Sequence, residues 1–329
     1  MKLRIGRMNH GPENLITDVP GVRVGHTTID RGDVHTGVTV VMPPPHNPFT
    51  DKLTAASVVH NGFGKTLGLV QVDELGTLET PIALTNTLNV GAVHDAMVGY
   101  MIDLCRDDGF RLTSVNPVIC ECNDSTMNRI EARAVTAADV RAAIGSASVR
   151  FDQGSVGAGR GTICYGMKGG IGSASRQFDI DSETFTIGVL VQSNYGASSD
   201  FLPSSLPPEL AECDKGSIII IVATDLPLSC RQLKRVLRRT SVGMARLGSY
   251  IGHGSGEIAV GFTTAPRTKS SDHFSTVRTL SEDAMNIPFR AVGEATEEAI
   301  LQSMLASQQD VSLSGETIPS LRDYFSPAD

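Results

Sequence analysis

The 329-residue sequence predicts an α+β protein in which helices cover a stacked pair of β-sheets. Strand-like and helix-like segments come in groups along the chain, which is typical of layered α+β proteins. Apolar residues make up 40 % of the chain, enough to bury a large core as one big domain or two small ones. The sequence has no internal repeat.

The N-terminal half begins with paired strands. Residues 22–26 alternate in polarity, and residues 37–42 form a second β-prone run before three prolines. Further strands are predicted at 55–60, 80–85 and 117–122. A helix over 90–106 and a short helix over 137–144 lie between and after them, and the first has one apolar stripe, made of Val93, Met97, Met101 and Leu104.

The C-terminal half contains the most apolar strand candidate in the chain, residues 218–223, preceded by another strong strand at 184–192. Ser229 can cap a helix over 230–247, whose inward residues would be Leu233, Val236, Leu237 and Met244. A strand at 257–263 and a final helix at 294–306 complete the prediction.

Composition argues against several functions. The net charge is −8 and no face is obviously basic, so we do not expect a nucleic-acid partner. The longest fully apolar run, 218–223, is too short to cross a bilayer, and no apolar core of signal-peptide length follows the N-terminus, so we expect no membrane association and a cytoplasmic location. The six cysteines form no CxxC pair and the eight histidines no HExxH motif, so neither a metal nor another cofactor is expected.

Two glycine-rich stretches imitate cofactor motifs. Residues 61–66 end like a phosphate-binding loop, but Val59 stands where that loop needs glycine, so we predict a turn into a helix. The glycines between 154 and 173 are too widely spread for a dinucleotide fingerprint. They predict strands packed closely against another backbone.

The sequence around the bond between Gly216 and Ser217 has the features expected of a self-cleavage site. A Pro- and Ser-rich segment precedes it and a buried strand follows it. The Ser217 hydroxyl could attack the Gly216 carbonyl, and hydrolysis of the resulting ester would leave Ser217 as a new terminus with its own α-amine beside it. A free α-amine has a pKa of about 7.7–8.0, which suits a general base. A simple loop entering a strand would look the same, and the residues alone leave both interpretations open.

Two other places combine polar side chains with glycines or strand ends. One is residues 252–257, which include Ser255 and Glu257, and the other is Asn194. Ser255 lacks the flanking glycines of a GxSxG nucleophile elbow, so an α/β-hydrolase is not indicated.

With these motifs in order, the sequence resembles, over nearly its whole length, the family of L-aminopeptidase/D-esterase-amidases and β-peptidyl aminopeptidases. The segments that carry the resemblance are 16–26, 61–65, 74–81, 168–172, 192–196, 216–220 and 254–257. The resemblance implies a four-layer αββα sandwich, similar to N-terminal-nucleophile hydrolases but differently connected. It implies one domain over 1–329, cut into an α chain of 1–216 and a β chain of 217–329, with a linker at about 197–216.

The resemblance also implies roles for individual residues. Ser217 would be the nucleophile, with Ser255 and Glu257 as its catalytic partners, and whether Glu257 or the Ser217 amine is the base stays open. Residues 255 and 257 project to the same side of a strand, so both can reach one point. The resemblance implies an oxyanion hole of the Asn194 amide and a backbone N–H near Gly256. It implies substrate contacts at Glu121 and Asn123.

The sequence departs from the family pattern at Thr126, where some relatives have a tyrosine nearby, and at Arg129, near an acidic position of the family. The leading function is a self-processing serine aminopeptidase that acts on short peptides, amides or esters, including β-amino or D-configured ones. An acyltransferase similar to ornithine acetyltransferase and a non-catalytic scaffold are the alternatives. A homotetramer of processed αβ units is the expected assembly.

Overall fold

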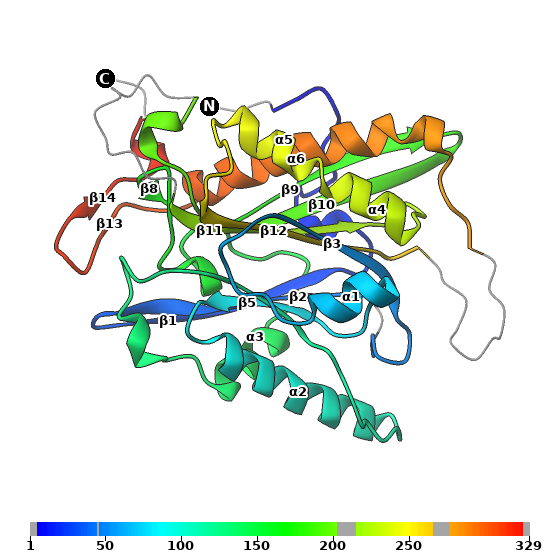
Figure 1. Ribbon diagram of the computed structural model, residues 1–329, viewed down its shortest axis with the longest axis horizontal. Helices are drawn as coiled ribbons and strands as arrows, with labels where there is room; N and C mark the ends of the chain where they lie inside the picture. Colours follow the sequence, from blue (N-terminus) through cyan, green and yellow to red (C-terminus); the bar gives the residue numbers. More distant parts are fainter. Residues whose placement is uncertain (1–4, 45, 203–214, 266–276, 325–329) are drawn as a thin grey trace.

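Two β-sheets lie face to face, and each is covered on its outer face by helices (Figure 1). The structure is a computed structural model, and it describes residues 5–44, 46–202, 215–265 and 277–324. This arrangement confirms the four-layer αββα sandwich. Most of the predicted linker, 197–216, lies outside the described residues.

The larger sheet has six strands in the order β4-β3-β12-β11-β10-β9. The central pair, β11 and β12, is parallel, and every other neighbouring pair is antiparallel. The strands span Leu53–Gly62 (β3), Thr77–Leu78 (β4), Gly170–Ile180 (β9), Glu183–Asn194 (β10), Lys215–Thr224 (β11) and Gly254–Thr263 (β12).

The smaller sheet has four strands in the order β1-β2-β5-β6. Strands β1 and β2 form the predicted antiparallel hairpin, and β5 and β6 are parallel. The strands span Arg23–Arg31 (β1), Val34–Met42 (β2), Ile82–Asn86 (β5) and Val118–Cys122 (β6). Two further strand pairs are short: Ile163–Cys164 (β7) with Met167–Lys168 (β8), and Asp310–Val311 (β13) with Thr317–Ile318 (β14).

Helices α4, α5 and α6 lie over the six-stranded sheet, and α2 and α3 lie under the four-stranded sheet (Figure 1). Helix α1 packs beside β3 and β4. The helices span Leu69–Leu75 (α1), Val90–Asp107 (α2), Ala137–Gly145 (α3), Cys230–Leu237 (α4), Thr240–Arg246 (α5) and Asn286–Leu305 (α6).

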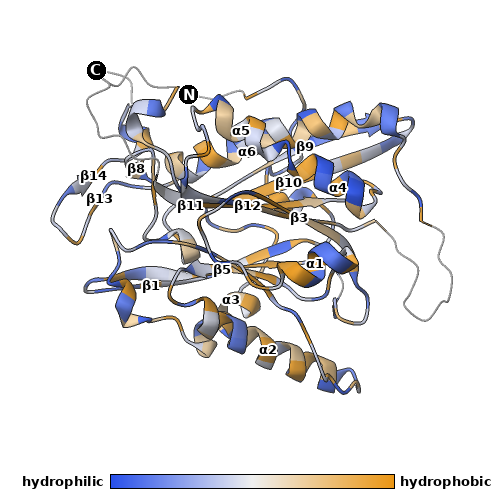
Figure 2. Ribbon diagram, in the orientation of Figure 1, coloured by the Kyte–Doolittle hydropathy of each residue, from blue (hydrophilic) through white to orange (hydrophobic). Residues whose placement is uncertain are grey.

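The apolar core has three layers, one between the sheets and one between each sheet and its helices. Strand β11 contributes to two of them. Ile218 and Ile220 pack toward the helices, whereas Ile219 and Ile221 pack between the sheets, and all four are buried. Each buried aliphatic side chain contributes about 1.5–3 kcal/mol to folding, so β11 anchors the centre of the molecule (Figure 2).

Two helix predictions were wrong in their bounds. The predicted helix 230–247 is two helices, α4 and α5, because the Thr240 hydroxyl donates to the Leu237 carbonyl and α5 turns to press Gly243 against α6. A Cβ on Gly243 would lie 2.7 Å from the backbone nitrogen of Glu297, so the two helices are in close contact. Helix α6 begins at Asn286, eight residues before the predicted start. The Ser229 cap of α4 is confirmed.

Within the described ranges, no helix has both the length and the apolar character needed to cross a membrane.

Candidate active site

Ser217 lies at the start of β11, between the ends of two neighbouring strands. Its Cα partner on β10 is Asn194, and its partner on β12 is Gly256. Three residues that the sequence analysis singled out from distant parts of the chain are therefore side by side. The serine is only 4 % exposed.

Gly216 has a backbone conformation that strongly favours glycine. Its φ is +131°, and a Cβ at this position would lie 2.0 Å from the carbonyl oxygen of Asn194. Any side chain would therefore push β10 away from β11. The glycine brings the bond to Ser217 against the strand that carries Asn194.

A cavity of about 440 Å³ opens at this end of the two sheets. Gly216, Ser217 and Asn194 line it on the side of the larger sheet, and Glu121 and Asn123 line it from the end of β6. The remaining lining residues are Phe63, Lys65, Thr87, Ser125, Thr126, Ile163 and Gly254.

The side-chain amide of Asn194 is fixed by two bonds of opposite polarity. Its Oδ1 accepts from the backbone N–H of Ile163 at 3.0 Å, and its Nδ2 donates to the carbonyl of Asn123 at 2.9 Å. Because one partner is a donor and the other an acceptor, the amide has a single favourable orientation. The second N–H of Nδ2 remains for another acceptor in the cavity that Asn194 lines.

Ser255 and Glu257 are fully buried on β12, on either side of the residue opposite Ser217. Ser255 pairs with Gly216 and Glu257 pairs with Ile218. The Ser255 hydroxyl has no hydrogen-bond partner within the described part of the chain.

The strand register gives these side chains a direction that the sequence did not reveal. Paired residues direct their side chains to the same face of a sheet. Ile218 packs in the helix-side core and Ile219 in the core between the sheets. Ser255 and Glu257 therefore face the helix side, and the Ser217 side chain faces the gap between the sheets, where the cavity lies. The two partners flank the main chain of Ser217.

Asn61 belongs to segment 61–65, which carries part of the family resemblance, but the sequence analysis gave it no role. In the structure it holds the loop before Ser255. Its Nδ2 donates to the carbonyls of Gly252, at 3.0 Å, and Ser255. Asn61 lies opposite Glu257 on β3, where the pairing contains a bulge. A lone asparagine at a strand end gives no sequence signal for this function.

Glu121 is 3 % exposed and accepts hydrogen bonds with both carboxylate oxygens. The backbone N–H of Lys65 donates to Oε1 at 2.8 Å, and the Thr87 hydroxyl donates to Oε2. Asn123 also lines the cavity, and its Oδ1 accepts from the backbone N–H of Ser125 at 3.0 Å. The Glu121 carboxylate is therefore held in place beside the space that a ligand would fill.

The two departures from the family pattern lie in different surroundings. Thr126 lines the cavity, so its small side chain affects the space for a ligand. Arg129 pairs with Asp33 at 3.2 Å and does not line the cavity.

Cys122, the last residue of β6, lies near the site, and the sequence analysis gave it no role there. Its Sγ lies 3.4 Å from the carbonyl oxygens of both Ser217 and Gln192. Burial raises the pKa of this thiol well above its usual value, so it remains a neutral donor. The packing of β6 against β11, which no local sequence pattern encodes, places this thiol beside the Ser217 main chain.

In the parts of the chain that are described, no three His, Cys, Asp or Glu side chains gather closely enough to hold a metal ion.

Comparisons with known proteins agree with this arrangement. The model of peptidase family S58 matches residues 14–318. The β-peptidyl aminopeptidase BapA of Sphingosinicella microcystinivorans is 34 % identical over 94 % of this chain and 86 % of its own.

Solved structures are similar over the whole fold. The PH0078 protein from Pyrococcus horikoshii OT3 has a TM-score of 0.92 at 40 % identity, covering 98 % of this chain and 95 % of that one. The L-aminopeptidase D-Ala-esterase/amidase from Ochrobactrum anthropi, described as a new variant of the Ntn hydrolase fold, has a TM-score of 0.87 at 31 % identity, covering 97 % and 96 %.

The sandwich and the serine at its central strand end define a hydrolase with a variant of the N-terminal-nucleophile fold. The chain belongs to peptidase family S58 and is a self-processing serine aminopeptidase.

Proposed function

We propose that the chain cuts itself between Gly216 and Ser217. The Ser217 hydroxyl attacks the Gly216 carbonyl carbon, the C–N bond breaks, and an ester replaces the amide. Water then hydrolyses the ester and leaves a Gly216 carboxylate and a free α-amine on Ser217. The observation that carries this proposal is that Ser217 lies opposite Asn194 while Gly216, at φ +131°, lines the same cavity.

The proposed products are an α chain of 1–216 and a β chain of 217–329 within one domain. In the processed enzyme the α-amine of Ser217 is the general base, because its ordinary pKa of about 7.7–8.0 suits proton transfer near neutrality. Ser255 and Glu257 orient that amine, since both flank the main chain of residue 217.

The Ser217 hydroxyl would attack the substrate carbonyl, and the α-amine would take its proton. The Asn194 amide, together with a backbone N–H near Gly256, stabilises the oxyanion that forms. The amine or alcohol leaves, an acyl-enzyme remains on Ser217, and water releases the acid. Loss of one oxyanion donor typically lowers the rate by about 10²–10³.

The proposed substrates are short peptides, amides or esters with a free N-terminal amine, including β-amino and D-configured residues. The Glu121 carboxylate supports this choice, because it lies in the cavity where it can pair with an ammonium group. Asn123 is the second proposed contact. Relatives named as a β-peptidyl aminopeptidase and a D-Ala-esterase/amidase favour these substrate classes. A cytoplasmic location and a homotetramer of αβ units complete the proposal.

Intact-mass analysis of the purified protein tests the self-cleavage. The 34.9 kDa chain should yield fragments of about 23 and 12 kDa, in proportion to their lengths. Ser217→Ala should remain at full length, whereas Ser146→Ala, at the far end of α3, should be cut like the wild type. A wild-type protein that stays intact after long incubation, or a cut at another bond, refutes the proposal.

A further inference from the structure

We propose that Lys168 is a positioning residue that polarises the Asn194 amide through one peptide group, and so strengthens it as an oxyanion donor. This inference rests on the proposed oxyanion role of Asn194. Lys168 lies on β8 and belongs to a segment that carried the family resemblance, but the mechanism above gives it no function.

Lys168 is a fully buried ammonium group held by carbonyl oxygens alone. Its Nζ donates to the carbonyls of Arg160, at 3.1 Å, and Thr162, at 3.0 Å. No carboxylate lies within ion-pairing distance in the described parts of the chain. A buried charge without an ion-pair partner is costly, so this ammonium group depends on its bonds to the two carbonyls.

The Thr162 carbonyl that Lys168 binds belongs to the same peptide group as the Ile163 N–H. That N–H donates to Asn194 Oδ1 at 3.0 Å, and Asn194 Nδ2 in turn donates to the Asn123 carbonyl at 2.9 Å. The Gly169 N–H also donates to the Thr162 carbonyl, at 3.0 Å. Each bond in such a chain polarises the next, so the cation makes Ile163 a stronger donor and the Asn194 N–H more acidic.

The chain of hydrogen bonds from Lys168 through the Thr162–Ile163 peptide group to Asn194, here called the relay, ends at the cavity. Ile163 and Asn194 both line it, next to Ser217, while Lys168 stays behind them and touches no part of it. Lys168 therefore acts through Asn194 and has no direct contact with substrate. The added polarisation counts most when negative charge develops, so it should favour the transition state over the bound substrate.

The charge of Lys168 is sensitive to pH. Burial and, to a smaller extent, the Arg160 guanidinium lower the pKa of Lys168 to about 8, against the opposing effect of the carboxylates of Asp310, Asp124 and Asp30. Arg160 is itself neutralised by ion pairs with Asp30 at 2.9 Å and Asp310 at 2.6 Å. The relay should therefore weaken as the pH rises above about 8.

The first test compares Lys168→Met with wild type after processing. Methionine retains much of the volume and removes the charge. We expect kcat to fall roughly tenfold with KM within about twofold, and the affinity for an amino-aldehyde that forms a hemiacetal oxyanion to fall in parallel. The affinity for the corresponding amino-alcohol, which forms no oxyanion, should not change. Equal loss for the aldehyde and the alcohol, or none, overturns the inference.

Two controls separate this role from a structural one. The Ser307 hydroxyl donates to the carbonyl of Gly169 at 2.6 Å, next to Lys168, so Ser307→Ala should lower the melting temperature and leave aldehyde affinity unchanged. Asn194→Ala should lose aldehyde affinity by at least as much as Lys168→Met. If Asn194→Ala has no effect, the proposed oxyanion hole fails; if only Lys168→Met has none, the relay alone fails.

A measurement on the wild type completes the test and keeps it decisive if Lys168→Met leaves the precursor uncut. Deprotonation of the Ser217 amine raises the ratio of aldehyde to alcohol affinity, whereas loss of the Lys168 cation lowers it. Because the amine is largely deprotonated above about pH 8, the ratio should pass through a maximum and then fall between about pH 8 and 9.5 as Lys168 loses its charge. A ratio that levels off or goes on rising above pH 8 overturns the inference.

Discussion

Glu121 illustrates how single residues in this site are held before any substrate arrives. Its two oxygens already accept from the Lys65 N–H and the Thr87 hydroxyl, so the carboxylate cannot turn away from the cavity. A charged group held in this way can bind an ammonium ion with little loss of side-chain freedom.

Glu121→Gln should weaken the binding of substrates that carry a free amine. The change retains the shape and removes the charge, and a hydrogen bond to a charged group contributes about 1.5–3 kcal/mol, so KM should rise about 10- to 100-fold with a smaller change in kcat. The measurement is steady-state kinetics with an amino ester and its desamino analogue.

Glu131→Gln is the matched control, because Glu131 is exposed and lies outside the cavity. It should leave both substrates unaffected. If Glu121→Gln raises KM equally for the amino ester and the desamino ester, Glu121 does not recognise the amine.

The sequence predicted which residues would gather at the cavity better than it predicted their contacts. Polar residues beside glycines and strand ends pointed to Ser217 and Asn194, and the resemblance to a family pointed to Glu121. The cavity brings these three together. The direction of Ser255 and the contact of Cys122 depend on which strands are neighbours, which local patterns do not encode.

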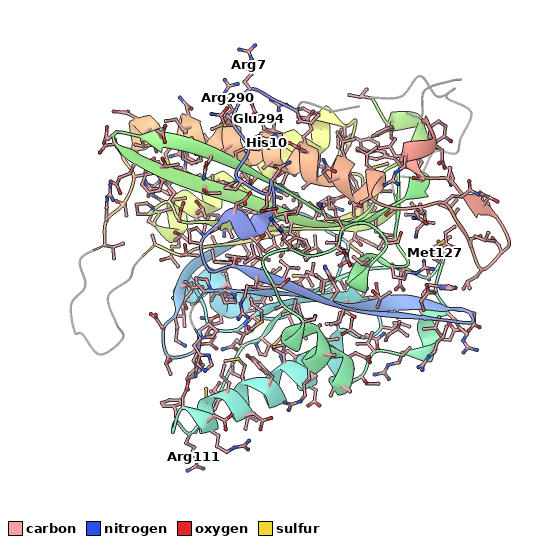
Figure 3. All side chains as sticks on the ribbon, turned by 180° about the vertical axis from the view of Figure 1, so that it is seen from behind. Arg7, His10, Arg111, Met127, Arg290 and Glu294 are labelled. Carbon is pink, nitrogen blue, oxygen red and sulfur yellow. The ribbon has the colours of Figure 1, made fainter. Side chains whose placement is uncertain are left out.

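Strand β9, helix α6 and the N-terminal segment are joined by a buried ionic cluster. Arg176 on β9 donates to Glu298 at 2.6 Å, and Glu294 accepts from the backbone N–H groups of Arg7 and Met8, each at 3.0 Å. Figure 3 shows Arg7 above Glu294 of α6 and His10 just below it. The segment before β1 is thereby tied to the helix layer.

Arg176→Ala should destabilise the protein strongly, because it removes the fully buried cation that pairs with the buried carboxylates of Glu294 and Glu298. The loss should be about 3–5 kcal/mol in the free energy of unfolding, measured with urea. Arg278→Ala is the control, since Arg278 makes an exposed ion pair with Glu183, and its loss should leave the free energy of unfolding nearly unchanged. Equal effects of the two changes would contradict this reasoning.

Most elements followed from periodicity, and the exceptions have packing causes. Residues 230–247 carry one apolar stripe, which two shorter helices bury as well as one long helix would. The early start of α6 at Asn286 has no side-chain cap, and Pro288 and Gly293, two residues with low helix propensity, lie in its first turns, so periodicity and propensity place the start too late.

Stability of the molecule as a whole should decline in acid partly through His26. Its Nδ1 bonds the Thr39 hydroxyl at 2.9 Å, its Nε2 bonds the Asp152 carbonyl at 3.1 Å, and burial lowers its pKa from 6.5 to about 4. Between pH 6.5 and about 4, His26 therefore binds a proton in the unfolded chain but not in the folded chain. The contribution of His26 to the free energy of unfolding is fully present above pH 6.5, and it falls by up to about 3 kcal/mol as the pH drops toward 4.

His26→Gln should remove this part of the pH dependence. Urea unfolding at pH 7.5 and pH 4.5 should differ less in the variant than in the wild type. His46→Gln is the control, because the side chain of His46 is 80 % exposed, and its pH dependence should equal that of the wild type. An unchanged slope in His26→Gln would show that His26 does not contribute.

The layered class was predictable from the whole sequence, but the order of strands was not. β11 lies between β10, which precedes it in the chain, and β12, and β12 in turn pairs with β3, which comes from much earlier in the chain. Such pairings depend on long-range packing, so local propensity cannot specify them. The resemblance to a family predicted the four-layer αββα order, whereas the residue patterns alone predicted only two stacked sheets covered by helices.

The strand order has a consequence for the mature enzyme. A cut before Ser217 would leave β11 and β12 in one polypeptide and their neighbours β3 and β10 in the other. The two products would stay associated, because separating them would break the hydrogen bonds of two strand pairs, β10 with β11 and β12 with β3. Once denatured, however, they would have to find each other again, so recovery of the native enzyme would depend on protein concentration, unlike refolding of the uncut precursor.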